Sequence, residues 1–307
     1  MLDKAEDQQR GDLWIDWLLK GRHSPKNMRY MQQSQAEIEA YADRVLLHAK
    51  LAPNQTMVDV GAGEGLVSLK AIDQIGPTLR VILTDISQPL LNHAKKLAGE
   101  RGVADQCAFL KCSAHQLEVI TDASVDVVIT RAALAYVEDK QTAFSEFSRI
   151  LKPGGRISLA EPVFRDDAIM ASVMRTLMES QIEAAGSPDP FTRLMHIWRS
   201  SQFPDTQEQI AMNALTNYTE RDLVQWAMAY GFKDIHMELH IDVKPSLIDW
   251  DTFLEISPHP YAPTLQSIMQ EKFTAEERQL FEKTMKPIIE SDSSTSNYRV
   301  AYLSARK

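Results

Sequence analysis

The sequence lacks the features that mark several large classes of protein. It has no apolar stretch long enough to cross a bilayer, and its start, MLDKAEDQQRGDLW, is too charged for a signal peptide. Its two cysteines, Cys107 and Cys112, form no Cys-x-x-Cys pair, and its histidines are not clustered along the chain. We therefore expect neither a metal site nor a disulfide framework, and we expect a protein of the reducing cytoplasm without membrane attachment.

A surplus of basic residues is also missing. The chain has 33 Lys and Arg against 42 Asp and Glu, which gives a formal net charge of −9. Surfaces that bind DNA or RNA carry a dense basic stripe, so nucleic acid is not the expected partner. Hydrophobic residues make up 44% of the 307 residues, enough for a large buried core.

Short apolar runs alternate with amphipathic stretches in the middle of the chain. The runs are rich in β-branched residues and nearly continuous in hydrophobicity, as in strands that helices cover on both faces. This alternation predicts a parallel, doubly wound α/β sheet. The expected strands cover residues 56–60, 80–85, 107–111, 124–130 and 156–161, and the expected helices lie within 64–76, 88–102 and 140–155.

The regions on both sides of this core are mainly helical. Before it, helical spacing covers 11–21 and 34–51, and Ser34 with Glu37 forms a predicted capping box after a break. After it, a capped helix is expected over 219–232, and alternation predicts strands over 233–242 and 297–305. The expected units are an N-terminal helical cap (1–55), the core (56–162), a helical insert (163–218) and a C-terminal part of the sheet (219–307) with a second helical insert at about 245–290.

Three closely spaced glycines, Gly61, Gly63 and Gly65, follow the first expected strand. Glycines this close together indicate either a structural turn or a backbone that passes near a ligand. The dinucleotide fingerprint needs a further glycine where Leu66 stands, and no Gly-Lys-Ser/Thr follows, which excludes a P-loop.

Asp85 ends the second expected strand, about 20 residues beyond the glycines, where an acidic residue can accept both hydroxyls of a ribose. The alternative is that Asp85 only caps the next helix. Ser87 is the better cap, which would leave Asp85 free for a ligand.

Five segments in order carry a family resemblance. VDVGAGEG, LTDIS, CSAHQL, VDVVITRAALAYVED and ILKPGGRISLAEP resemble the successive motifs of class I S-adenosylmethionine-dependent methyltransferases. The resemblance covers residues 56–162 and continues weakly into the last strands. It implies a Rossmann-like sheet of seven strands with an antiparallel pair, and S-adenosylmethionine as the cofactor.

The resemblance also implies roles for individual residues. The glycine loop and Asp59 would lie beside the methionine part of the cofactor, Asp85 at the ribose, and Ile86 at the adenine. Arg131 and Tyr136 would position the reactants near the transferred methyl group, and Tyr30 would close over the cofactor from the N-terminal break. The implied cofactor-binding residues are Tyr30, Asp59, Gly61, Gly63, Gly65, Asp85, Ile86, Ser113, Ala114, His115 and Arg131.

The acceptor is open at this stage. No Asp/Asn-Pro-Pro-Tyr/Phe follows the fourth strand, which disfavours methylation of nucleic-acid bases, and no carboxylates stand there for a catechol-type metal. A small-molecule acceptor remains. The charged residues of the first insert either form a solvated face or a basic mouth for an anionic or zwitterionic acceptor. They are Arg165, Arg193, His196 and Arg199.

Three alternatives stay open beside this reading. A neutral acceptor could lie against Trp198, Phe203 and Trp226, with the arginines merely solvated. The protein could instead be an NAD(P)-dependent oxidoreductase or a catalytically silent methyltransferase-like binding protein. It could also form a homodimer.

Overall fold

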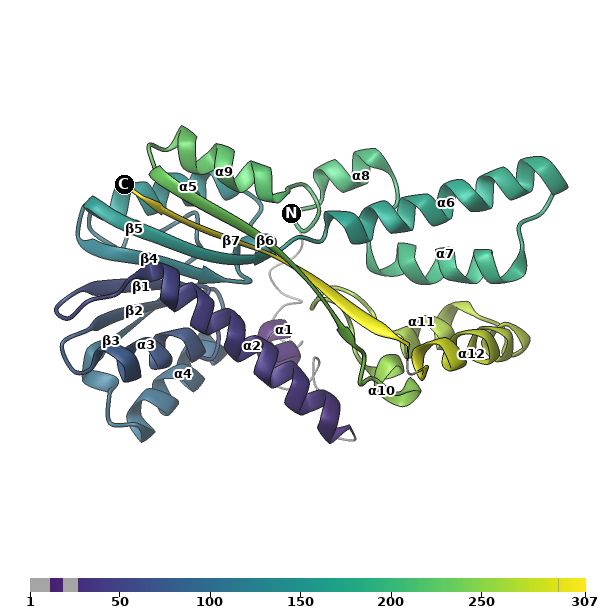
Figure 1. Ribbon diagram of the computed structural model, residues 1–307, viewed down its shortest axis with the longest axis horizontal. Coiled ribbons are helices and arrows are strands. Elements are labelled where there is room, and N and C mark those ends of the chain that lie inside the picture. Colours follow the sequence, from purple (N-terminus) through teal and green to yellow (C-terminus); the bar gives the residue numbers. More distant parts are fainter. Residues whose placement is uncertain (1–11, 19–26, 292) are drawn as a thin grey trace, which may run out of the picture.

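The computed structural model describes residues 12–18, 27–291 and 293–307. Its centre is a sheet of seven strands in the order β3-β2-β1-β4-β5-β7-β6 (Figure 1). The first five strands run parallel, and β7 pairs antiparallel with both β5 and β6. The strands are β1 (Thr56–Val60), β2 (Arg80–Asp85), β3 (Cys107–Lys111), β4 (Val125–Arg131), β5 (Leu151–Pro162), β6 (Lys233–Pro245) and β7 (Thr295–Arg306). The predicted α/β fold with an antiparallel pair is confirmed.

Helices cover both faces of the sheet, which is why β1 and β4 are buried along nearly their whole length. One hydrophobic cluster packs α5 and α9 on the first face through side chains such as Phe144 and Leu223. A second cluster packs α2, α3 and α4 on the other face through Val45, Val67 and Leu91. These helices are α2 (Met28–Ala49), α3 (Leu66–Ile75), α4 (Gln88–Glu100), α5 (Lys140–Ile150) and α9 (Glu220–Ala229).

Two helical segments extend from the core on the same side (Figure 1). The first follows β5, and the second lies at the far end of the long β6–β7 pair. A shared cluster joins them, with Leu194 and Trp198 of α7 packed near Phe281 of α12. The helices are α6 (Arg165–Ala185), α7 (Pro190–Gln202), α8 (Gln207–Met212), α10 (Trp250–Glu255), α11 (Leu265–Lys272) and α12 (Ala275–Ile289).

The N-terminal region differs from the prediction at one helix boundary. The second helix begins at Met28 rather than Ser34, because the side chain of Asn27 accepts a hydrogen bond of 2.9 Å from the backbone N–H of Tyr30 and caps it. The predicted capping box at Ser34 is therefore wrong, since Ser34 lies inside the helix. The first predicted helix appears as α1 (Leu13–Asp16), and residues 19–21 of that prediction lie outside the described residues.

A helix was expected within 140–155, but α5 ends at Ile150, and residues 151–155 form the first part of β5. Leu151 pairs with Val125 of β4, and Gly154, with a φ of +79°, lies in the irregularity of register that separates this pair from the rest of the ladder. Among the described helices, none combines the length and the apolar character needed to cross a bilayer.

Candidate active site

The glycine loop is fixed at the carboxyl end of β1 by backbone hydrogen bonds. The N–H groups of Gly61 and Ala62 donate to the carbonyl oxygen of Thr84, at 2.8 and 2.9 Å, and so tie the loop to β2. Gly61 has a φ of +70°, and a Cβ atom built there would lie 2.4 Å from the Cβ of Ala133. Glycine is required at this position because the loop after β4 packs directly against it.

Asp85 lies at the end of β2 with 8% of its surface exposed. Its Oδ2 accepts from the N–H of Gly63 at 2.9 Å, and its Oδ1 accepts from the N–H of Ser87 at 2.8 Å. Burial raises the pKa of this carboxyl above its ordinary value. A carboxylate has about four acceptor positions, so Asp85 keeps acceptor capacity for the ribose hydroxyls that the resemblance predicts here. The Ser87 hydroxyl caps α4, as expected, by accepting from the N–H of Leu90.

A cavity of about 330 Å³ opens beside the glycine loop. It contains most of the residues that the resemblance assigned to the cofactor, brought together from the ends of four parallel strands. Those in its wall are Gly61, Gly63, Asp85, Ile86, Ser113, Ala114, His115 and Arg131, and the predicted positioning residue Tyr136 also lines it. Motifs that are far apart in the sequence therefore meet at one cavity in the fold.

Two of the assigned residues lie behind this wall. Asp59 is 2% exposed, and its Oδ2 accepts from the hydroxyl of Ser68 at 2.7 Å. Burial raises the pKa of Asp59 to about 6. Gly65 has a φ of +82° at the start of α3, and a Cβ atom there would lie 3.2 Å from the Cβ of Ala94. Both residues support the glycine loop without lining the cavity.

Arg131 ends β4 and contributes to the cavity wall. The negative charges that act on it come from Asp59, Glu64 and Glu161. Burial lowers the pKa of the guanidinium, and these carboxylates oppose that effect. A buried cation surrounded by carboxylates stays charged, so Arg131 supplies a fixed positive charge at the cavity.

Sequence reasoning missed Glu161, which holds the loop after β4 in place. This carboxylate is fully buried at the end of β5 and accepts from the hydroxyl of Thr130. It also accepts from the backbone N–H groups of Ala133 at 3.4 Å and Ala135 at 3.2 Å. Burial raises its pKa. The sequence signal for it was a glutamate at the end of a mostly apolar expected strand. A buried charge at such a place costs free energy unless the group is hydrogen-bonded.

Aromatic side chains form the other side of the cavity. Trp14 of α1 lies edge-on to Tyr136, with ring centroids 4.9 Å apart, and edge-on to Tyr261 at 5.7 Å. Trp17 also lines the cavity. Trp14 and Trp17 are therefore the N-terminal aromatic residues beside this cavity, whereas Tyr30, which was predicted there, lies in the first turn of α2 and lines a different cavity.

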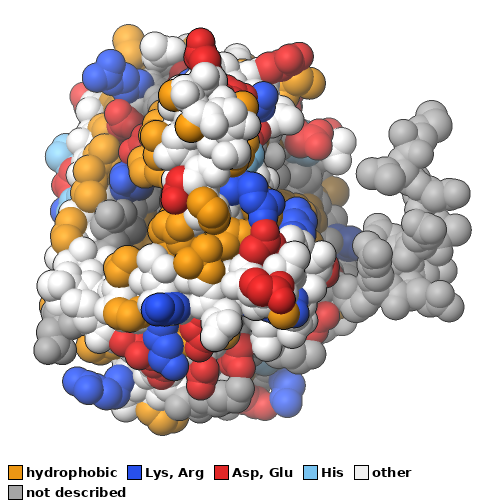
Figure 2. Space-filling model, turned by 90° about the vertical axis from the view of Figure 1, so that its right-hand side faces the viewer, with side chains coloured by type: hydrophobic (Ala, Val, Ile, Leu, Met, Phe, Trp, Pro, Cys, Tyr) orange, Lys and Arg blue, Asp and Glu red, His pale blue; other side chains and the backbone are white. Residues whose placement is uncertain are grey.

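This second cavity, of about 360 Å³, lies between α2 and the two helical segments. Trp17 lines both cavities. Eight aromatic residues line the wall, and four charged residues lie among them: Glu37, Asp167, Arg199 and Arg299. On the face that carries the helical segments, hydrophobic side chains gather at the centre, with charged side chains of both signs nearby (Figure 2).

Of the four predicted acceptor residues, only Arg199 lines this cavity. Its Nη2 lies 3.3 Å from Oδ1 of Asp167. Arg193 instead pairs with Glu277, and His196 pairs with Asp205 at 2.7 Å. The remaining residue, Arg165, donates to the carbonyl oxygen of Thr216 at 3.4 Å. Arg299 of β7 was not predicted, because its position in the last strand gave no sign that it faces the inserts.

Comparison with known proteins decides the family. The profile of a methyltransferase domain matches residues 51–218, more than half of the chain. The chain is a class I S-adenosylmethionine-dependent methyltransferase. Its cofactor is S-adenosylmethionine, and the oxidoreductase alternative is not favoured.

Relatives of this methyltransferase act on different acceptors. It is 33% identical over 129 residues to the tRNA 5-carboxymethoxyuridine methyltransferase of Escherichia coli K12. The aligned residues make up 42% of this chain and 48% of that protein. It is 31% identical over 134 residues to a ubiquinone/menaquinone biosynthesis C-methyltransferase of Ectopseudomonas mendocina, with coverages of 44% and 52%. The methyltransferase thus spans about half the length of the curated relatives that it matches.

A solved structure shows the same fold over most of the chain. The geranyl diphosphate C-methyltransferase of Streptomyces coelicolor, in complex with Mg²⁺, geranyl diphosphate and S-adenosyl-L-homocysteine, superposes with a TM-score of 0.50 at 17% identity. The match covers 92% of this methyltransferase and 84% of that one.

Proposed function

We propose that this methyltransferase acts on a small anionic or zwitterionic acceptor that binds in the second cavity. The observation that carries the proposal is the pair of Arg199 and Asp167 in the wall of that cavity. Trp17 separates this wall from the cofactor cavity, so a donor and an acceptor bound on its two sides are neighbours.

The pair fits both ends of a zwitterion. An arginine fork matches a carboxylate with two hydrogen bonds, which orients the acceptor as well as holding it. The aspartate accepts from an ammonium group. Burial raises the pKa of Asp167, while Arg199 lowers it, and a bound ammonium acts in the same direction as Arg199.

The proposed chemistry is in-line displacement at the methyl group. The sulfonium of the cofactor is already an electrophile, so the main task of the protein is to align the acceptor lone pair with the S–CH₃ bond. A thioether acceptor needs no base, whereas an ammonium must first lose a proton. In this proposal Arg131 and Tyr136 position the reactants from the cofactor side.

RNA is the competing acceptor, because one relative acts on tRNA. The net charge of −9 disfavours a nucleic-acid surface on this chain.

The free thiols of Cys107 and Cys112 favour a reducing compartment such as the cytoplasm.

The test begins with methyl-labelled S-adenosylmethionine and two pools, a small-metabolite extract and total RNA. We expect label in an anionic or zwitterionic metabolite. With that acceptor, Arg199→Met should raise the KM about tenfold or more, since a charge-assisted hydrogen bond contributes about 1.5–3 kcal/mol. The affinity for the cofactor should stay near native.

Arg193→Met is the matched control, because Arg193 lies on the same helix but pairs with Glu277 outside the cavity. Its KM should remain close to that of the native enzyme. Equal KM values for the two variants, or label in RNA alone, would contradict the proposed acceptor.

A further inference from the structure

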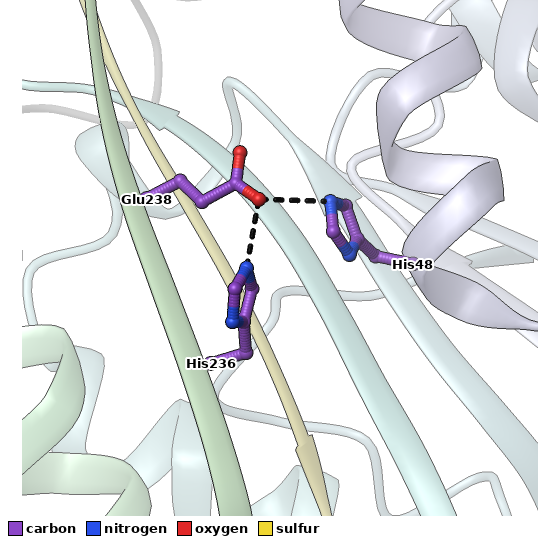
Figure 3. A group of neighbouring side chains, drawn as sticks. All are labelled: His48, His236 and Glu238. Carbon is purple, nitrogen blue, oxygen red and sulfur yellow. Dashed lines mark hydrogen bonds and ion pairs between the residues drawn. The ribbon is translucent and has the colours of Figure 1, made fainter.

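We propose that His48, His236 and Glu238 form a binding site for a divalent transition metal, with zinc as the best fit. The site lies at the edge of the sheet, where the end of α2 meets β6 (Figure 3). None of the three residues lines either cavity. The site is therefore independent of the methyl-transfer chemistry.

Two elements bring the three side chains together. His48 is in the last turn of α2. His236 and Glu238 are two residues apart on β6, so their side chains point to the same face of the sheet. The three ligand atoms lie within 4.8 Å of one another, and Figure 3 shows the Glu238 carboxylate between the two imidazoles.

The two oxygens of Glu238 have different surroundings. Oε1 lies 2.7 Å from Nε2 of His236 and 3.6 Å from Nε2 of His48. Oε2 accepts from Arg44 and lies 2.8 Å from Nε2 of His240. Oε1 thus faces the two imidazoles, while Arg44 and His240 hold Oε2. Hydrogen bonds of this second kind orient carboxylate ligands in metal sites.

His48 provides an independent observation. Its Nε2 atom is buried and has no hydrogen-bond partner among the described residues. Most buried polar atoms in proteins are paired, and leaving one unpaired is costly. This nitrogen points toward Glu238 Oε1, so an ion held between the three ligand atoms would satisfy it.

The donor set selects the class of metal. Two imidazole nitrogens and one carboxylate oxygen suit zinc, which binds three such protein ligands with water as the fourth. Magnesium and calcium prefer oxygen ligands and gain little from imidazole. Zinc–nitrogen bonds of about 2.0–2.1 Å require small shifts of these side chains. His236 can move easily, because 56% of its side chain is exposed.

No metal was expected from the sequence because His48 and His236 stand far apart in the chain. The competing interpretation is that the imidazoles only form hydrogen bonds with Glu238. The two interpretations differ in a direct measurement, since only a metal site binds zinc with a defined stoichiometry.

The experiment uses the untagged full chain, freed of metal with a chelator, and calorimetric titration with zinc chloride. We expect one zinc ion per chain and a rise of a few degrees in the Tm on addition of zinc. His236→Gln and His48→Gln should each weaken zinc binding about tenfold or more. His93→Gln, on α4, is the matched control and should bind zinc like the native chain.

The variant at the exposed position, His236→Gln, keeps the test valid if the buried His48→Gln variant is unstable. Cobalt substitution gives a second readout, because visible absorption bands typical of tetrahedral cobalt should appear in the native chain and weaken in His236→Gln. Absence of stoichiometric zinc binding, unchanged affinity in His236→Gln, or equal binding of magnesium would each overturn the proposal.

Discussion

Asp85 and Gly63 are joined by a hydrogen bond of 2.9 Å, from the backbone N–H of the glycine to Oδ2 of the aspartate. It links the acid at the end of β2 to the loop at the end of β1. The two motifs that the resemblance assigned to the ribose and to the methionine part of the cofactor are therefore a single structural unit. We expect loss of the Asp85 carboxylate to remove a predicted cofactor ligand and also to release the glycine loop.

We expect Asp85→Ala to weaken binding of S-adenosylmethionine by about 1.5–3 kcal/mol, or roughly 10- to 150-fold in Kd, because charge-assisted hydrogen bonds are lost. Calorimetry on the purified variant measures this directly. Asp73→Ala is the control, since Asp73 is exposed on α3 and pairs with Arg101. Equal affinities of the two variants would remove Asp85 from the cofactor site.

The glycines of the loop should respond differently to the same substitution. Gly61→Ala places a Cβ atom 2.4 Å from Ala133, so we expect a loss of stability of about 2 kcal/mol or more. At Gly63 the nearest atom is 3.4 Å away, on Leu18, and only the positive φ opposes a side chain, at about 1 kcal/mol. Denaturant unfolding measures both values. A Gly61→Ala variant as stable as Gly63→Ala would show that the loop after β4 does not pack as described.

Glu161→Gln tests the support of the loop after β4. The neutral amide keeps the shape of the side chain, but only its oxygen can accept hydrogen bonds. It therefore cannot accept at both positions from Thr130 and from the N–H groups of Ala133 and Ala135. We expect stability to fall by about 1–3 kcal/mol, and cofactor affinity to fall with it because this loop lines the cavity. The exposed Glu118 on the surface serves for comparison, and Glu118→Gln should change neither quantity.

Asp59 should make the stability of the cofactor-free protein depend on pH in a defined direction. Its pKa is about 6 in the folded state and near the ordinary 3.8 when unfolded, so the folded state holds the proton more tightly. This contribution to stability is present below about pH 4 and is lost as the pH rises to about 6.

Asp59→Asn removes that dependence. The stability of the variant relative to the native protein should rise by about 2–3 kcal/mol between pH 4 and pH 7. Urea unfolding at several pH values measures the difference. Parallel pH profiles for the two proteins would show that Asp59 does not titrate abnormally.

The parts of the molecule that could be predicted are those whose signal is local. The strand 56–60, the glycines behind it and Asp85 are close in sequence, and their roles follow from the order of strands in a parallel sheet. The α9 capping box of Thr219 and Asp222 was readable for the same reason, because the two groups stand three residues apart.

Contacts between distant segments could not be predicted. Asn27 caps α2 and is itself held by Leu247 and Asp249, which come from the other end of the chain. Arg299 reaches the second cavity only because β7 extends beyond the core next to α6, where it pairs with Asp166 at 3.0 Å. The hydrophobic periodicity of these segments does not indicate such contacts.

The helices α10, α11 and α12 lie in the chain between β6 and β7, the two strands at one edge of the sheet. Changes of length between Pro245 and Thr295 therefore leave the register of the five parallel strands untouched. These helices nevertheless supply part of the second cavity through Phe253 and Leu265. Under the proposed function, this wall of the acceptor cavity can vary among related chains while the cofactor site stays constant, so such chains would share a donor and differ in acceptor.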